Sequence, residues 1–239
     1  MKIIKFDIQQ GIYHFETEYL DTELHAHPAV EIVMAEKGTF DLKTPFFEES
    51  ALRFAIIDAH TLHQVTADAC CIKLLMLESC NTLFNNRLNQ LGIAFTHGVF
   101  TAHTSSEIFQ QLETFGNNHS LWLTTDERVN NCLQIFREND LEYQEMIESL
   151  KAITFLSESR LSHLFKEHVG ISLKKYLVWT KLKKTIAYLL QEEANLTQSS
   201  LQGGFYDQAH FTKAFKNLLG ISPSKAYNSR TLQFLFPSV

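Results

Sequence analysis

The spacing of apolar and polar residues divides the chain into two parts. Up to about residue 100, short runs rich in β-branched and aromatic residues alternate with turn residues and polar patches. Such closely spaced runs are typical of a small barrel or sandwich of strands. The pattern predicts strands over residues 11–15, 30–35, 39–44, 52–57 and 71–77.

Beyond this region the apolar residues recur every three or four positions, which is the period of a helix that buries one face. Ile108, Leu112 and Phe115 would share one face of a first helix, which the Gly-Asn-Asn sequence at residues 116–118 is expected to end. A second helix should begin at Asp126, because aspartate is a favoured N-terminal cap. Further helices are predicted from residue 142 almost to the end, among them 175–190 and 196–202.

One segment of the helical part occurs twice, at residues 160–177 and 210–227, offset by 50 positions. Both copies contain Phe-Lys, then Gly-Ile-Ser, then a further Lys. Each runs from a short helix into a Gly stop, after which the Ser can cap another helix. Two copies are too few for a solenoid, which needs about three repeats. We therefore expect two equivalent helices on one body, as in helix-turn-helix DNA readers.

These two helices are predicted to bury one face and expose the other. The apolar positions expected to point inward are Leu161, Leu164, Phe165, Phe211, Ala214 and Phe215. Polar, amide and basic side chains remain on the open side, and such groups can bond base edges and phosphates. They are Ser159, Arg160, Ser162, His163 and Lys166 in the first copy, and Gln208, His210, Thr212 and Lys213 in the second.

Charge is unevenly distributed behind a net value of −6. Residues 1–149 carry 9 Lys and Arg against 22 Asp and Glu, whereas residues 150–239 carry 12 against 5. An asymmetry of this kind points to one nucleic-acid-binding domain. No stretch approaches ~18 consecutive apolar residues, and the N-terminus has no signal-peptide core. We expect a cytoplasmic protein without a membrane partner, whose four cysteines are buried, inert thiols.

Residues 126–230 resemble the tandem helix-turn-helix domain of the AraC/XylS transcription regulators. The segments SESRLSHLFKEHVGIS and GFYDQAHFTKAFKNLLGISPSKAY carry the likeness. It implies two recognition helices, joined by a long helix, that read successive major grooves of double-stranded DNA. It adds Ala209 to the DNA-binding positions given above. It also implies an effector-responsive homodimer formed through the N-terminal domain, with the helix 107–115 as the candidate dimer surface and RNA polymerase as a possible partner. Ordinary core packing is an equal alternative for the apolar stripe of this helix.

The strand-rich part contains a second motif, His25-x-His27-x-x-x-Glu31 followed by Gly38, which fits the first motif of the cupins. His63 falls where the second cupin motif places its histidine. These four residues form an N3O set suited to Fe, Mn, Zn or Ni. The sensor domains of AraC-type regulators resemble cupins and often use such residues without a metal. We therefore expect His25, His27, Glu31 and His63 to bind the effector, with no cofactor, and keep a divalent metal as the alternative.

Together these observations predict an α+β protein of two domains. Residues 1–120 would form a cupin-like sensor and dimerisation domain with a trailing helix, and residues 124–239 an all-α tandem helix-turn-helix domain. The predicted function is sequence-specific transcription regulation in response to a small molecule, without enzymatic activity. A metal-dependent cupin enzyme with an appended helical domain is the alternative.

Overall fold

Two antiparallel sheets form the N-terminal half in the computed structural model, which describes residues 1–80, 82–102, 106–139, 142–191 and 195–228. The larger sheet has the strand order β1 (Lys2–Asp7), β2 (Ile12–Thr17), β9 (Cys71–Leu77), β4 (Val30–Lys37), β7 (Phe54–Ile57) and β10 (Val99–Ala102). The smaller sheet has the order β3 (Leu20–Asp21), β8 (Gln64–Ala67), β5 (Phe40–Lys43) and β6 (Glu48–Leu52).

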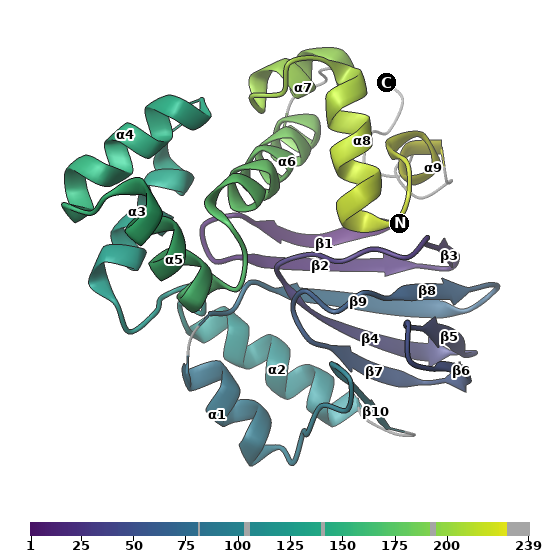
Figure 1. Cartoon of the computed structure of the whole chain (residues 1–239). Coiled ribbons are helices and arrows are strands. Elements are labelled where there is room, and N and C mark those ends of the chain that lie inside the picture. The colour runs from purple at the N-terminus through teal and green to yellow at the C-terminus, as the bar shows by residue number, and fades with distance from the viewer. Residues whose placement is uncertain (81, 103–105, 140–141, 192–194, 229–239) are drawn as a thin grey trace.

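Side-chain alternation on the central strands gives this half two cores. On β4, Val33 faces the core shared by the two sheets, while Ile32 faces the opposite side of the larger sheet. That outer side is covered by α1 (Thr82–Gln90) and α2 (Ser106–Asn118) (Figure 1). Because both faces of β4 and β9 are covered, these strands read as nearly continuous apolar runs, and their prediction is confirmed.

Two local expectations for the N-terminal half are wrong. The predicted strand 52–57 is divided at Arg53 into the end of β6 and the start of β7. The first hundred residues are not all strands and loops, because α1 lies within them. Helix α2 ends at Asn118, within the predicted stop at residues 116–118. A Cβ built on Gly116 would lie 2.9 Å from Leu77, so the missing side chain lets α2 approach the sheet closely.

The expected dimer surface on α2 also needs correction. Leu112 is fully buried, and Ile108 and Phe115 pack against the same core. The apolar stripe of this helix therefore faces its own sheet. Dimerisation remains a prediction that this stripe does not support.

The C-terminal half is all-helical, as predicted. Its elements are α3 (Glu127–Glu138), α4 (Tyr143–Thr154), α5 (Glu158–Val169), α6 (Leu173–Gln191), α7 (Leu196–Gln202), α8 (Gln208–Leu219) and α9 (Pro223–Asn228). Asp126 caps α3 by accepting a hydrogen bond from the backbone N–H of Arg128, and Asp207 caps α8 through His210. The two-domain α+β fold class is thus confirmed; residues 229–239 of the predicted second domain lie outside the described residues.

The two halves pack directly against each other. Figure 1 shows α6 and α8 lying over β1 and β2 of the larger sheet. Tyr13 and Met76 of that sheet belong to the same core cluster as Trp179, Leu182 and the apolar residues of α5 and α8. Among the described residues, no helix has both the length and the apolar character needed to cross a bilayer.

Candidate functional site

The duplicated segments fold into two equivalent helix-turn-helix units. In the first, α4 leads into α5, and Phe155 makes the turn with a left-handed φ of 55°. In the second, α7 leads into α8 through Gly203 and Gly204. Phe165 and Phe215, which are equivalent in the repeat, are both buried, and α6 connects the two units.

The structure places all ten predicted DNA-binding residues on α5 or α8. Eight of them are exposed, and Ser162 and Thr212 are half-buried. In the second helix, Gln208 accepts a 2.6 Å hydrogen bond from the Thr197 hydroxyl, and the His210 ring packs edge-on against Phe205. Helices α5 and α8 thus present comparable polar faces, and on α8 the side chains of Gln208 and His210 contact neighbouring residues. Base contacts by these residues remain predictions.

Both recognition helices end against loops of the barrel, which sequence reasoning did not anticipate. The glycines that end them, Gly170 and Gly220, have φ values of 85° and 69°. The Nε2 atom of His60 lies 3.3 Å from the carbonyl oxygen of Val169, and a Cβ on Gly170 would lie 2.7 Å from that nitrogen. His60 therefore contacts the end of α5.

At the other helix, the backbone N–H of Glu23 donates to the carbonyl oxygen of Gly220 at 2.7 Å. A Cβ on Gly220 would lie 2.5 Å from Nδ1 of His25 and 2.6 Å from the Glu23 carbonyl oxygen. The Lys216 ammonium also lies 2.8 Å from the Glu23 carboxylate. The acidic barrel therefore holds the end of α8 by backbone contact and by charge.

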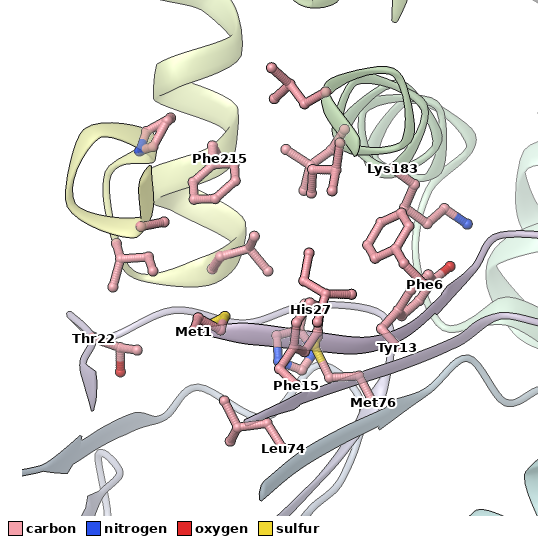
Figure 2. Close-up of a pocket in the computed structure, with 18 of the residues that line it drawn as sticks. Met1, Phe6, Tyr13, Phe15, Thr22, His27, Leu74, Met76, Lys183 and Phe215 are labelled. Atoms are coloured by element: carbon pink, nitrogen blue, oxygen red, sulfur yellow. The ribbon is translucent and has the colours of Figure 1, made fainter. Parts of the chain in front are cut away.

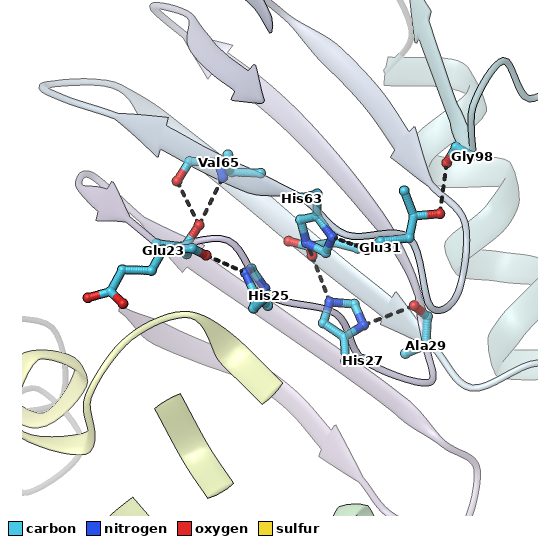
Figure 3. Close-up of polar contacts among 10 residues, drawn as sticks. Glu23, His25, His27, Ala29, Glu31, His63, Val65 and Gly98 are labelled. Atoms are coloured by element: carbon cyan, nitrogen blue, oxygen red, sulfur yellow. Dashed lines mark hydrogen bonds and ion pairs between the residues drawn. The ribbon is translucent and has the colours of Figure 1, made fainter. Parts of the chain in front are cut away.

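The four residues of the cupin-like motif come together in one buried cluster (Figure 3). His25 and His27 lie in the segment between β3 and β4, Glu31 is on β4, and His63 immediately precedes β8. One ligand atom from each lies within 4.8 Å of the others. Oε2 of Glu31 is 2.9 Å from Nε2 of His27 and 3.0 Å from Nε2 of His63. We call these four residues the histidine cluster.

Burial controls the charges in the histidine cluster. Burial, together with the neighbouring His63 and His27, lowers the pKa of His25 to about 3. Burial alone would raise the pKa of Glu31, but its contacts with His27 and His63 hold the pKa well below the usual range. A carboxylate is therefore kept ionised at the centre of the cluster. Another buried histidine, His14, lies outside the cluster, with Nδ1 2.7 Å from Glu113.

An apolar cavity of about 150 Å³ lies between the barrel and the helical half (Figure 2). Tyr13, Phe15 and Met76 of the sheet line one side, and Ile186 and Phe215 line the other. His25, His27 and Glu31 form part of its wall, whereas His63 does not. The effector site was expected in the barrel, and barrel residues line one side of this cavity, while α6 and α8 form the other side.

Beside the cavity, a buried ionic network crosses from one half to the other. The Lys183 ammonium on α6 lies 2.5 Å from Glu78, which follows β9, and Tyr13 donates a short hydrogen bond to the same carboxylate. The Arg137 guanidinium lies 3.9 Å from it. Burial would raise the pKa of Glu78, but the two cations lower it below its usual value. Lys183 of the helical half therefore binds a carboxylate of the sensor half.

Comparisons with known proteins fit this arrangement. A family model described as a helix-turn-helix domain matches residues 150–229. The chain is 31% identical over 108 residues to the arabinose operon regulatory protein of Escherichia coli, covering 45% of this chain and 37% of that protein. It is 28% identical over 113 residues to an uncharacterised HTH-type transcriptional regulator of Haemophilus influenzae, covering 47% and 37%. The chain thus spans less than half the length of these relatives.

The whole fold is similar to that of ToxT from Vibrio cholerae. The alignment with one crystal structure of ToxT covers 95% of this chain and 98% of the ToxT chain, with a TM-score of 0.55 and 11% identity. Another, of ToxT with an unsaturated fatty acid bound, covers 90% and 93%, with a TM-score of 0.51 and 11% identity. Identities this low show the fold alone.

Proposed function

We propose that this chain is a regulator of the AraC/XylS type, which controls transcription by sequence-specific binding to double-stranded DNA. The observation that carries this proposal is the pair of equivalent helices, α5 and α8, with exposed polar and basic faces. Long cations such as Arg160 and Lys213 can reach bases or phosphates. The protein would act in the cytoplasm, where its DNA target lies.

The alternative, a metal-dependent cupin enzyme, has the histidine cluster as its support. It leaves the duplicated helices and the excess of positive charge after residue 150 without a role. For this reason we favour a regulator without enzymatic activity. Turnover of a substrate by the purified chain would reverse this preference.

We further propose that a small apolar or amphipathic molecule acts as effector in the cavity between the two halves. Apolar side chains line this cavity almost throughout, a common composition for ligand sites. The similar fold of ToxT has been solved with an unsaturated fatty acid bound, and a fatty acid is an amphipathic ligand of this kind. The cavity is lined by both the sheet and α8, so a movement of α8 changes the contacts of a bound ligand. The ligand would then bind the two positions of α8 with different affinities, which is the condition for it to shift the equilibrium between them. His25, His27 and Glu31 would supply its polar wall.

Homodimerisation through the N-terminal half and contact with RNA polymerase complete the proposal by family resemblance. Each chain of the dimer would then bind its own half of the operator with its α5 and α8. Within one chain, α5 and α8 would contact successive major grooves about 34 Å apart.

The test is selection of DNA by the full chain from a random pool, followed by affinity measurement over a range of salt concentrations. We expect enrichment of a defined sequence and a log–log salt slope that steepens by about 0.9 for each phosphate contacted. Arg160→Ala and Lys213→Ala should each weaken binding, at separate base pairs. Lys43→Ala, on the barrel surface beside Glu48, is the matched control and should bind as the parent does. Folded protein that enriches no sequence would contradict the proposal.

A further inference from the structure

The three histidines of the histidine cluster are oriented by backbone carbonyls in the same way. Nδ1 of His25 lies 2.9 Å from the Glu23 oxygen, and Nδ1 of His63 lies 2.9 Å from the Thr61 oxygen. Nδ1 of His27 lies 3.0 Å from the Ala29 oxygen. A carbonyl oxygen only accepts hydrogen bonds, so each Nδ1 carries the hydrogen. In a neutral imidazole the other nitrogen, Nε2, is then an acceptor with a free lone pair.

The acceptors of the cluster converge on one another. Nε2 of His27 and Nε2 of His63 both approach Oε2 of Glu31, which as a carboxylate oxygen is itself an acceptor. Among the described residues, no lysine or arginine pairs with this buried carboxylate. Each Nε2 therefore approaches the carboxylate in one of two ways: as the N–H of a protonated imidazole, or as a ligand of a cation that it shares with the carboxylate.

We propose that His25, His27, Glu31 and His63 bind one divalent transition-metal ion of the series from iron to zinc. Three imidazoles and one carboxylate suit these ions, whereas calcium and magnesium prefer oxygen ligands. All four side chains are at least nine-tenths buried, and their ligand atoms lie within 4.8 Å of one another. The three carbonyl contacts supply the outer hydrogen bonds that fix the tautomer of metal-bound histidines. The proposal takes up the metal alternative that the sequence left open.

The site also contacts the reader half at two points. The His27 ring stacks on Trp179 of α6 with a centroid distance of 6.3 Å. His25 packs against Gly220 at the end of α8. An ion that fixes the His25 and His27 rings would therefore fix the surface of the barrel that α6 and α8 contact. Ion binding itself does not depend on whether the chain binds DNA, so the two proposals can fail separately.

The experiment uses the full chain, freed of metal with a chelator and titrated with Co²⁺. Equilibrium dialysis with elemental analysis gives the stoichiometry, and the visible spectrum reports nitrogen and oxygen ligation. Trp122→Phe leaves Trp179 as the single tryptophan, and Co²⁺ at the cluster should quench its fluorescence. We expect one equivalent of Co²⁺, displaced by Zn²⁺.

His27→Ala and Glu31→Gln should each weaken Co²⁺ binding at least tenfold, since loss of even an outer hydrogen bond costs about 10- to 100-fold. His119→Ala, which removes an exposed histidine just after α2 and outside the cluster, should bind as the parent does. Circular dichroism checks that each variant folds, and the stoichiometry of the parent stands without any variant. Less than about one-tenth of an equivalent bound by the parent, or unchanged binding in both folded cluster variants, overturns the assignment.

Discussion

Glu23 donates its backbone N–H to the carbonyl oxygen of Gly220 over 2.7 Å, so a loop of the barrel is bonded to the residue that ends α8. The same loop carries His25 and His27, which line the cavity. A ligand that reshapes this loop must therefore change how α8 is seated. This contact gives the sensor half a direct route to the second recognition helix.

The contribution of this seating can be isolated by substituting glycines. Gly220→Ala places a Cβ 2.5 Å from His25 and 2.6 Å from the Glu23 oxygen, in a left-handed backbone with φ of 69°. Gly92→Ala meets the same backbone strain at φ of 70° with nothing within 4 Å. The strain alone costs about 1–2 kcal/mol. We expect Gly220→Ala to lower the free energy of unfolding by about 1–3 kcal/mol more than Gly92→Ala, from overpacking.

Denaturant unfolding of the two variants measures this difference. Gly220→Ala should also change DNA affinity, because α8 must move from the loop, while Gly92→Ala should leave affinity unchanged. Equal destabilisation of the two variants would show that the Glu23–Gly220 contact does not persist in solution.

Substitutions of exposed and of buried residues on α8 should affect different properties, DNA binding in the first case and stability in the second. Lys213→Ala and Gln208→Ala remove exposed groups, so the free energy of unfolding should change by less than about 0.5 kcal/mol. Loss of a good base contact should relax specificity by about 1–3 kcal/mol at one base pair. Phe215→Ala empties a core position and should cost about 3–5 kcal/mol of stability. Thermal melts and footprinting check both; a footprint in which Arg160→Ala and Lys213→Ala disturb the same base pairs contradicts the two-reader geometry.

The ionic network between the halves should matter more than any surface ion pair. Lys183→Met leaves the buried Glu78 carboxylate without its nearest cation, which should cost about 3–5 kcal/mol of unfolding free energy. Lys181→Met on the same helix breaks a pair with the exposed Glu142 and should cost at most about 1 kcal/mol. Chemical denaturation measures both. Similar losses in the two variants would mean that water reaches Glu78.

Filling the cavity should separate effector response from DNA binding. Ile186 lines the cavity from α6, away from the exposed faces of α5 and α8. Ile186→Phe should occupy part of the 150 Å³, leave DNA affinity within about twofold, and abolish the response to the effector. Ile153→Phe, at an exposed position on α4, controls for the added aromatic ring. A full response in folded Ile186→Phe places the effector elsewhere.

The features predicted well from the sequence are those with a local signal. Strand β9 could be predicted at its observed bounds because its largely apolar run, interrupted by Lys73, ends at Glu78. The pair α5 and α8 followed from the repeat, since Phe165 and Phe215 occupy one position in it. Strand β1 lacks such a signal, because its side chains are half-exposed. Helix α1 has only Phe84 and Leu88 as buried residues, too few to mark a helical face.

The sites that depend on distant partners were less accessible. The histidine cluster could be predicted because His25, His27 and Glu31 are close in sequence and the cupin pattern placed His63 with them. The helical wall of the cavity could not be predicted, because the cavity is formed by segments about 170 residues apart in sequence, such as Tyr13 and Ile186. The burial of Lys183 was not anticipated, although Lys183 lies four residues after Trp179 and seven after Tyr176, on the apolar face of α6. That spacing was the available signal.

The Glu78–Lys183 pair has a consequence for how this chain can change over evolutionary time. Each half supplies one charge to a place from which water is excluded. If the helical half were joined to another sensor domain, Lys183 would be buried without Glu78. If this sensor domain were joined to another DNA-binding domain, Glu78 would be buried without Lys183. Viable hybrids must therefore inherit both residues or lose both, and the shuffling of modules by recombination is constrained at this one point.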